Sequence, residues 1–164
     1  MCRMRNKSSK ITLPVNKPPA NKLKYMPTKT NSIGLNTKGN ADILDITDQV
    51  SRVVAESGIK DGIVTLFCPS STSAMTTIEY ESGCLSDLRR LFDEIVDPNR
   101  PFAHNARWGD GNGHSHVRAA ILGASFTVPF VSGRLTLGTW QQIIFVDFDN
   151  RPRRRELVVQ ILGD

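Results

Sequence analysis

The segment SFTVPFVSGRLTLGTWQQIIFVDFDNRPRRRELVVQIL, residues 125–162, contains three strand-like runs with no helical pattern between them. The runs cover residues 125–131, 134–149 and 153–162, and the turn sequences SGR and DNRPR separate them. Val, Ile, Phe and Thr favour strands, and Gly, Pro and Asn favour turns. Successive strands without an intervening helix favour antiparallel pairing, so we expect an α+β fold, mainly antiparallel and sandwich-like, with a few packed helices.

Upstream of this segment, the chain alternates between strand-like and helical patterns. Strands are predicted at residues 30–37, 61–68 and 73–81. A short strand followed by a helix is predicted within residues 43–58, with Thr47 or Asp48 as the N-cap and Gly58 as the C-terminal stop. The buried positions expected on this helix are Val50, Val53 and Val54.

Two further helices are predicted in the middle of the chain. The first covers residues 84–96, where five apolar side chains recur at helical spacing. The second begins near Asn112 or Gly113, and its apolar positions are Val117, Ala120, Ile121 and Ala124. Between them, residues 98–113 are expected to form an irregular loop.

The 164 residues are enough for one domain with a proper core. The net charge of +5 is unevenly distributed, because residues 1–40 hold nine of the 21 basic residues and no acidic one. The remaining 12 basic residues face 16 acidic ones, so the body carries about 12 − 16 = −4. We expect residues 1–28 to form a disordered basic tail, without a specific role or as a nucleic-acid-binding arm, and residues 29–164 to form a single domain.

Cysteine content and hydropathy constrain the environment of the protein. Cys2, Cys68 and Cys84 are odd in number and form no CxxC pair, which argues against a disulfide framework or a zinc knuckle. No apolar run approaches the roughly 18 residues needed to cross a membrane. We therefore expect a soluble, cytoplasmic protein with no membrane partner.

Two of the chain's three histidines lie in DGNGHSHVRAAILG, residues 110–123. His104, Asp110, His114 and His116 could together bind a divalent metal ion, Mg²⁺ or Zn²⁺. Residues two apart on a helix point about 200° apart, so at most one of His114 and His116 is expected to join His104 unless the helix begins after His116. Asn112 and the helix start could instead bind a phosphate, and local packing of each histidine is the alternative to both.

The run CPSSTSAMTTIEYE, residues 68–81, supplies a second candidate. The hydroxyls of Ser71, Thr72 and Ser73 could bind phosphate oxygens, and Glu79 could act as a catalytic carboxylate projecting from the following strand. Serine and threonine are also ordinary turn residues, and acids at alternate positions often form a solvated strand face.

A third candidate is GRLTLGTWQQ, residues 133–142, where Arg134 could hold a phosphate and Trp140 and Gln141 could line a pocket for a flat ring. A hairpin with a packed tryptophan would explain the same residues. The basic turn NRPRRR, residues 150–155, could meet a diphosphate or remain solvated.

Three runs in this order closely resemble the YjbQ-like family, also called UPF0047, whose members are often labelled secondary thiamine-phosphate synthase. The runs are STSAMTTIEYESG, then His104 followed by DGNGHSHVRAAILGAS, then VPFVSGRLTLGTWQQIIFVDFDNRPRRRELVVQI. GNGHSHVRA and GRLxLGTWQQ are the specific motifs, and the resemblance extends from Thr30 to Ile161 while the tail has no counterpart.

The resemblance implies a YjbQ-like fold, a homotrimer, and a polar site near subunit boundaries. It also implies a weak transferase activity that joins hydroxymethylpyrimidine diphosphate to thiazole phosphate and releases diphosphate. In that reaction His104, His116 and Glu79 would be catalytic, and a divalent metal would assist. Many family members have a histidine where this chain has Ser71, which puts in doubt any mechanism that requires an imidazole there.

Two other function classes remain as alternatives. One is a metal-dependent hydrolase or isomerase of a small phosphorylated metabolite, with the histidines as ligands of a transition metal. The other is a non-enzymatic trimeric protein that binds a metabolite or, through the basic tail, RNA.

Overall fold

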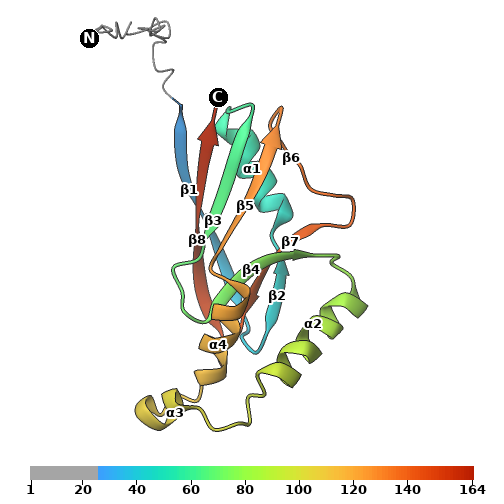
Figure 1. The fold of residues 1–164 in the computed structure, drawn as a ribbon. Coiled ribbons are helices and arrows are strands. Elements are labelled where there is room, and N and C mark those ends of the chain that lie inside the picture. The colour runs from blue at the N-terminus through green and yellow to red at the C-terminus, as the bar shows by residue number, and fades with distance from the viewer. Residues whose placement is uncertain (1–25) are drawn as a thin grey trace, which may run out of the picture.

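Eight strands and four helices build residues 26–164, the part of the chain that the structure, a computed structural model, describes (Figure 1). The strands are β1 (Thr28–Thr37), β2 (Asp42–Asp45), β3 (Gly62–Phe67), β4 (Ser73–Ile78), β5 (Ser125–Val131), β6 (Arg134–Leu135), β7 (Gln142–Asp147) and β8 (Arg153–Gly163). The helices are α1 (Thr47–Ser57), α2 (Ser82–Ile95), α3 (Ala103–Trp108) and α4 (Gly113–Leu122).

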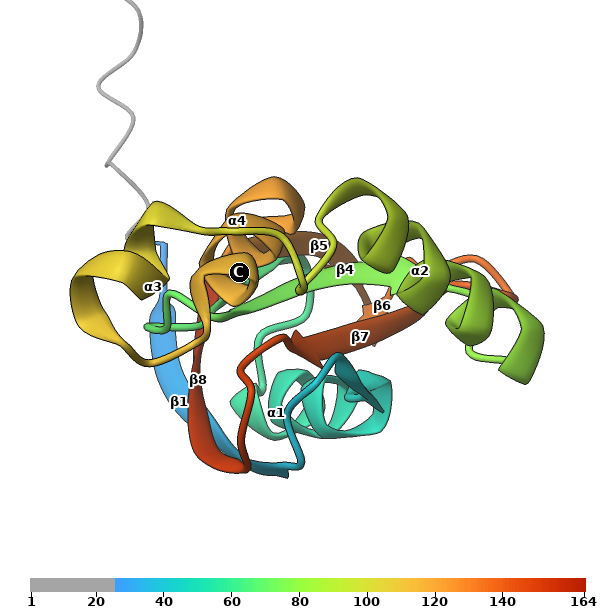
Figure 2. The ribbon, with the colours of Figure 1, turned by 90° about the horizontal axis from the view of Figure 1, so that it is seen from below.

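The strands form two sheets in which every pairing is antiparallel. The larger sheet has the order β1-β8-β3-β5-β6, and the smaller sheet has the order β2-β7-β4. Figures 1 and 2 show α1 behind the larger sheet and α2, α3 and α4 at the opposite end of the molecule. The expected α+β fold, mainly antiparallel, is confirmed.

Strand β7 joins the two hydrophobic clusters of the molecule because both of its faces are buried. Ile143 and Phe145 pack into the cluster that contains α1 and the larger sheet, whereas Ile144 and Val146 pack with Phe92 of α2. All four of these β7 side chains are at most 1% exposed. Burying an aliphatic or aromatic side chain this completely contributes about 1.5–3 kcal/mol to folding.

Helix α1 follows the expected boundaries but not the expected cap. Gly58 ends it in the left-handed conformation, as its sequence position predicts. The N-cap is Ile46, not Thr47 or Asp48, and it makes no side-chain cap bond. The Thr47 hydroxyl instead accepts a hydrogen bond from the backbone N–H of Ile143 at 2.8 Å, which ties the helix start to β7.

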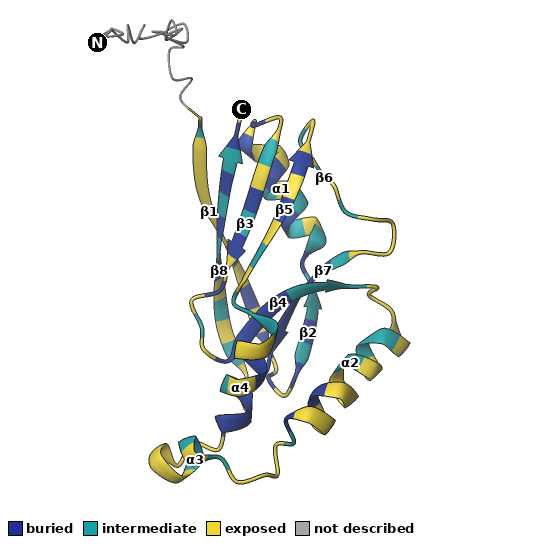
Figure 3. Ribbon diagram, viewed as in Figure 1, coloured by how far each residue is buried: buried dark blue, intermediate teal, exposed yellow. Residues whose placement is uncertain are grey.

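Helix α4 begins where expected, after Asn112, but its apolar stripe does not face the core. Val117 and Ile121 are 43% and 57% exposed. Figure 3 shows both buried and exposed segments along α4. The buried positions are Gly113, His114, Ser115, Arg118 and Ala119. The reason is tertiary, since the guanidinium of Arg118 donates to the carbonyl of Val96 and to Asp93 beneath the helix.

Two further expectations about local structure are wrong. The run at residues 134–149 is not one long strand, because residues 138–141 close on themselves: Gln141 N donates to Gly138 O, and Gly138 N donates to the Gln141 side chain. The loop at residues 98–113 contains α3, a short helix that ends at Gly109 in the left-handed conformation.

Strand β1 starts at Thr28, two residues before the predicted strand. The prediction of a disordered tail falls almost entirely on residues 1–25, which lie outside the described residues. Among the helices of residues 26–164, none has the length and apolar character that a membrane crossing requires.

Candidate functional site

Three segments that are distant in sequence meet around a polar hollow of about 420 Å³, within the range of small-ligand sites. We call it the histidine hollow. The turn between β3 and β4 contributes Pro69, Ser70, Ser71 and Thr72. The α3–α4 region contributes His104, Trp108, Asp110, Asn112 and His116, and the C-terminal hairpin contributes Asp149, Arg153 and Arg155.

The close approach of α3 to α4 depends on the absence of a side chain at Gly113. A Cβ atom at this position would lie 2.6 Å from the Cβ of Phe102 and 2.9 Å from the side-chain oxygen of Asn105. That same Asn105 oxygen accepts a hydrogen bond from the backbone N–H of Gly113 at 2.8 Å. The glycine therefore lets the start of α3 pack directly against the first turn of α4.

This packing brings His104 and His116 together. Their ring centroids are 4.4 Å apart, and Nε2 of His104 lies 3.1 Å from Oδ2 of Asp110. The sequence predicted that position 104 and the segment after residue 112 lie close together, and this geometry agrees with that prediction. The catalytic and ligand roles assigned to these side chains remain predictions.

The Asp110 carboxylate is held in its charged form. Desolvation acts against this, but the hydrogen bond and charge of His104 lower the pKa of Asp110 below its ordinary value. The amide of Asn112 adds to the same cluster. With its nitrogen turned toward Asp110, it lies 3.1 Å and 3.2 Å from the two carboxylate oxygens and 3.3 Å from Nε2 of His104.

The floor of the hollow is a network of buried acids and arginines. Asp147 and Asp149 are 0% and 1% exposed, and the guanidinium of Arg155 donates to Asp147 at 2.7 Å through both Nε and Nη2. Arg155 also donates to the hydroxyls of Ser70 and Thr72, so it fixes the Ser/Thr turn against the C-terminal hairpin. Burying Asp149 would raise its pKa, but the hydrogen bond from Arg153 holds that pKa below its ordinary value.

Asp147 and Asp149 were missed by the sequence reasoning. Their signal was present in FVDFD, where two acids alternate with apolar residues; Asp147 is the last residue of β7 and Asp149 lies just beyond its end. Ionised groups are rarely fully buried unless they are paired, so two such acids followed by Arg153 and Arg155 indicate a buried ion-pair cluster.

His114 is separated from the other two histidines. It is 7% exposed, its ring lies 6.1 Å from that of Phe102, and within the described residues its Nδ1 atom has no hydrogen-bond partner. Burial, followed by the charge of Arg118, lowers the pKa of His114, which favours the neutral imidazole. The helical-geometry argument that only one of the pair joins His104 agrees with this arrangement.

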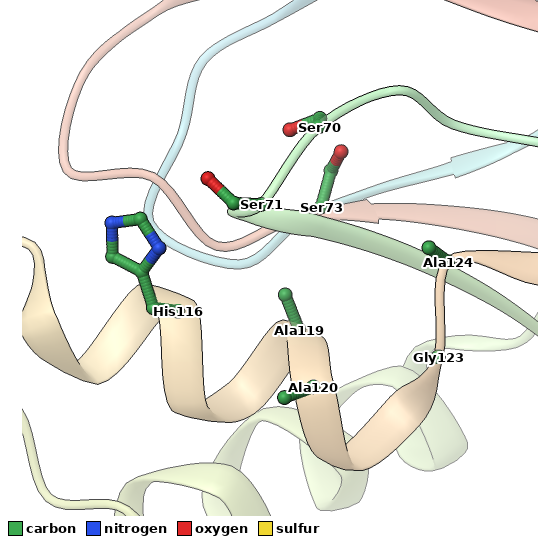
Figure 4. A pocket seen from close by; sticks show the side chains of 8 residues that line it. All are labelled: Ser70, Ser71, Ser73, His116, Ala119, Ala120, Gly123 and Ala124. Atoms are coloured by element: carbon green, nitrogen blue, oxygen red, sulfur yellow. The ribbon is translucent and has the colours of Figure 1, made fainter.

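A second, less polar hollow of about 310 Å³ adjoins the first and shares Ser70, Ser71 and His116 with it. We call it the alanine hollow. Its other lining residues are Ser73, Ala119, Ala120, Gly123 and Ala124. Figure 4 shows the segment with Ser70, Ser71 and Ser73 passing over α4, with the hydroxyls of Ser71 and Ser73 turned away from the alanines and His116 at one end. Ser73 is fully buried and its hydroxyl lies 2.9 Å from the sulfur of Cys68, whose pKa is raised by burial.

The remaining predicted site residues lie elsewhere in the chain. Arg134 and Gln141 line a different hollow beside α1, and Trp140 is 71% exposed. Figures 1 and 2 place β6 and the loop that follows it far from α3. Glu79 is exposed just beyond the end of β4 opposite Ser73. Its neighbour Glu81 caps α2 by accepting from the backbone N–H groups of Gly83 and Cys84.

The predicted metal set does not fit this arrangement as a whole. Over residues 26–164, no three His, Cys, Asp or Glu side chains are grouped to hold a metal ion. Of the four predicted ligands, His104 lies beside Asp110 and His116, but His114 faces the interior.

The chain is similar to known proteins in both sequence and structure. Residues 31–164 match the family described as UPF0047 protein YjbQ-like. A UPF0047 protein of Methanothermobacter thermautotrophicus is 40% identical over 139 residues, which is 85% of this chain and 95% of that protein. The UPF0047 protein YugU of Bacillus subtilis is 34% identical, covering 80% of this chain and 98% of its own.

Solved structures agree with these relatives. A crystal structure from Sulfolobus solfataricus P2, described as a YbjQ-like protein of unknown function, superposes with a TM-score of 0.81 at 37% identity. The match covers 85% of this chain and 100% of that one. A hypothetical protein from Aeropyrum pernix K1 gives a TM-score of 0.77 at 33% identity, covering 83% and 99% of the two chains.

Proposed function

This chain belongs to the UPF0047 YjbQ-like family, and from that membership and the histidine hollow we propose that it is a transferase of the secondary thiamine-phosphate synthase type. It would join hydroxymethylpyrimidine diphosphate to thiazole phosphate and release diphosphate, as a secondary activity beside another small phosphorylated substrate. The observation that carries the proposal is the convergence of His104, Arg153 and the Ser/Thr turn on one hollow at the start of α4.

The reaction makes one principal demand on the protein. The ring nitrogen of the thiazole attacks the methylene carbon of the pyrimidine, and the C–O bond to diphosphate breaks with its electron pair leaving on diphosphate. Charge therefore accumulates on the leaving group, and preorganised cations and hydrogen-bond donors stabilise that charge.

Arg153 is the most available cation of the hollow. Its Nε donates to Asp149 at 2.6 Å, and within residues 26–164 its two terminal nitrogens have no hydrogen-bond partner. The exposed hydroxyl of Ser71 offers a further donor. Arg155 is held by Asp147, so its contribution is to position the turn that carries Ser70 and Thr72.

His104 is suited to serve the departing diphosphate. Its Nε2 atom faces Asp110, which orients the imidazole, and His116 lies against the same ring. In this proposal His104 donates a hydrogen bond or proton to a diphosphate oxygen as the C–O bond breaks. No step is assigned to a metal ion, because the predicted ligand set is not assembled.

We include in the proposal a homotrimer, in which a neighbouring copy of the chain completes the site. Support comes from large apolar side chains that are exposed on the single chain, including Ile63 and Phe67 of β3 and Val117 and Ile121 of α4. Contiguous exposed apolar surface commonly marks a protein interface. A metal-dependent hydrolase gains no support from the geometry, and an RNA-binding tail would involve residues outside the described ones.

The proposal is tested by incubating purified protein with both substrates and measuring thiamine phosphate by its thiochrome fluorescence. We expect His104→Ala and His116→Ala to lower the rate by about a hundredfold, the size typical of losing a positioned proton donor. His114→Ala is the matched control from the same helix turn, and it should retain most of the activity of the folded fraction. Absence of product from wild-type protein, together with failure to restore growth of a thiamine-requiring strain, would overturn the proposal.

A further inference from the structure

We propose that Trp108 forms the wall of the histidine hollow against which the flat ring of a phosphorylated heterocycle stacks. The inference deepens the proposed function and rests on its premise that the hollow binds phosphate. It assigns the recognition of the ring to α3, whereas the sequence pattern assigned that role to Trp140.

The position of Trp108 on α3 directs it to the hollow. Residues four apart on a helix lie on the same face, and Trp108 follows His104 by four residues. Both side chains line the histidine hollow, together with Arg153 on the opposite segment. A ligand whose phosphate is held by Arg153 and the Ser/Thr turn would therefore extend toward the indole.

The indole is unusual in being left uncovered. Trp108 is 66% exposed although tryptophan is highly buried on average. The guanidinium carbon of Arg107 lies 5.5 Å from the ring centroid, so one face of the indole is covered by a cation and the other is available for stacking. Aromatic side chains that present an open face beside a cationic groove are a recurring way to hold planar bases.

Two other locations could receive the ring. The alanine hollow is lined by small side chains and His116, and it contains no Phe, Tyr or Trp. Trp140 is 71% exposed and lines neither hollow. Since these are the only two tryptophans of the chain, each can be tested separately.

The experiment measures, by calorimetry, the binding of hydroxymethylpyrimidine monophosphate and of methyl phosphate, which lacks the ring. The ratio of the two affinities is the ring preference. We expect Trp108→Ala to reduce this preference by about tenfold to a hundredfold, in line with the loss of one stacked base. Methyl phosphate binding should stay within about twofold, and Trp108→Phe should recover most of the preference. Trp140→Ala is the matched control.

A spectroscopic readout separates stacking from a general loss of structure. In Trp140→Phe protein, Trp108 is the only tryptophan, and its emission should be quenched by the pyrimidine monophosphate and not by methyl phosphate. A ring preference that persists in Trp108→Ala, or that is lost in Trp140→Ala or Ala120→Leu instead, would overturn the inference. A change in the oligomeric state of Trp108→Ala relative to wild-type protein would also overturn it, because Trp108 would then be an interface residue. Failure of methyl phosphate and diphosphate to bind wild-type protein would instead defeat the proposed function.

Discussion

The histidine hollow and the segment at residues 134–141 both contain sequence motifs that predicted a site, but their surroundings in the fold differ. The hollow is built from three segments tied together by Arg155 and by the contact of α3 with α4. The 134–141 segment lies at the other end of the molecule, and its Arg134 and Trp140 are exposed. Buried partners hold the polar side chains of the hollow in place, whereas Arg134 and Trp140 are left on the surface.

The largest expected effect tests the floor of the hollow against the exposed segment. Arg155→Met should lower the free energy of unfolding by about 3–5 kcal/mol, because it leaves the buried carboxylate of Asp147 without its partner. Arg134→Met should change that free energy by no more than about 0.5 kcal/mol. Urea unfolding followed by circular dichroism measures both, and Arg155→Lys, which keeps the charge, should fall between them. Equal effects of the two methionine variants would remove the distinction between the regions.

A second comparison concerns anion binding by the two regions. Arg153→Ala should weaken the binding of inorganic diphosphate by about tenfold, the loss of one charge-assisted contact, and Arg134→Ala should leave it unchanged. Calorimetry measures both affinities. Arg134→Ala could weaken binding equally in a protein whose mass by light scattering is three times the 18.2 kDa of the chain. That result would mean that the two regions meet across a subunit boundary, and the comparison would then hold only within one chain.

The smallest effect distinguishes the two sides of α4. Burial lowers the pKa of His114 below its ordinary value of 6.5, so the folded protein keeps this imidazole neutral at pH values where the unfolded chain takes up a proton. Its contribution to stability is therefore present above pH 6.5 and is lost progressively as the pH falls from there to the lower pKa of the folded state. When the pH is lowered from 7.5 to 5.5, the free energy of unfolding of wild-type protein should fall by about 1 kcal/mol more than that of His114→Asn. Urea titrations of both proteins at each pH measure this difference. If the free energy of unfolding changes equally with pH in the two proteins, His114 is not kept neutral.

Regular elements with strong local signals were predictable. The strands at β3, β5 and β8 and the helices α1, α2 and α4 lie close to their expected limits, because hydrophobic period and glycine stops act over a few neighbouring residues. Helix α3 was not predicted, since six residues interrupted by polar side chains carry little periodicity and its stability comes from packing on α4.

The buried faces were harder to predict than the elements. Val117 and Ile121 have the spacing of a core stripe, yet Arg118 and His114 occupy the buried side of α4. A helix buries the face for which its neighbours offer partners, and the carbonyl of Val96 and the carboxylate of Asp93 are 20 or more residues away in the chain. Local pattern contains no information about such distant partners.

The amino-acid sequence alone determined the family, the antiparallel α+β class and the segment in which the histidines lie, because motif order and residue periodicity are local properties. Only the tertiary structure decided that His116 joins His104 while His114 turns inward, that Asp147 and Asp149 are paired with arginines, and that Trp108 stands in the hollow in place of Trp140. These outcomes depend on which distant segments pack together, and packing is settled by burial and pairing across the whole chain.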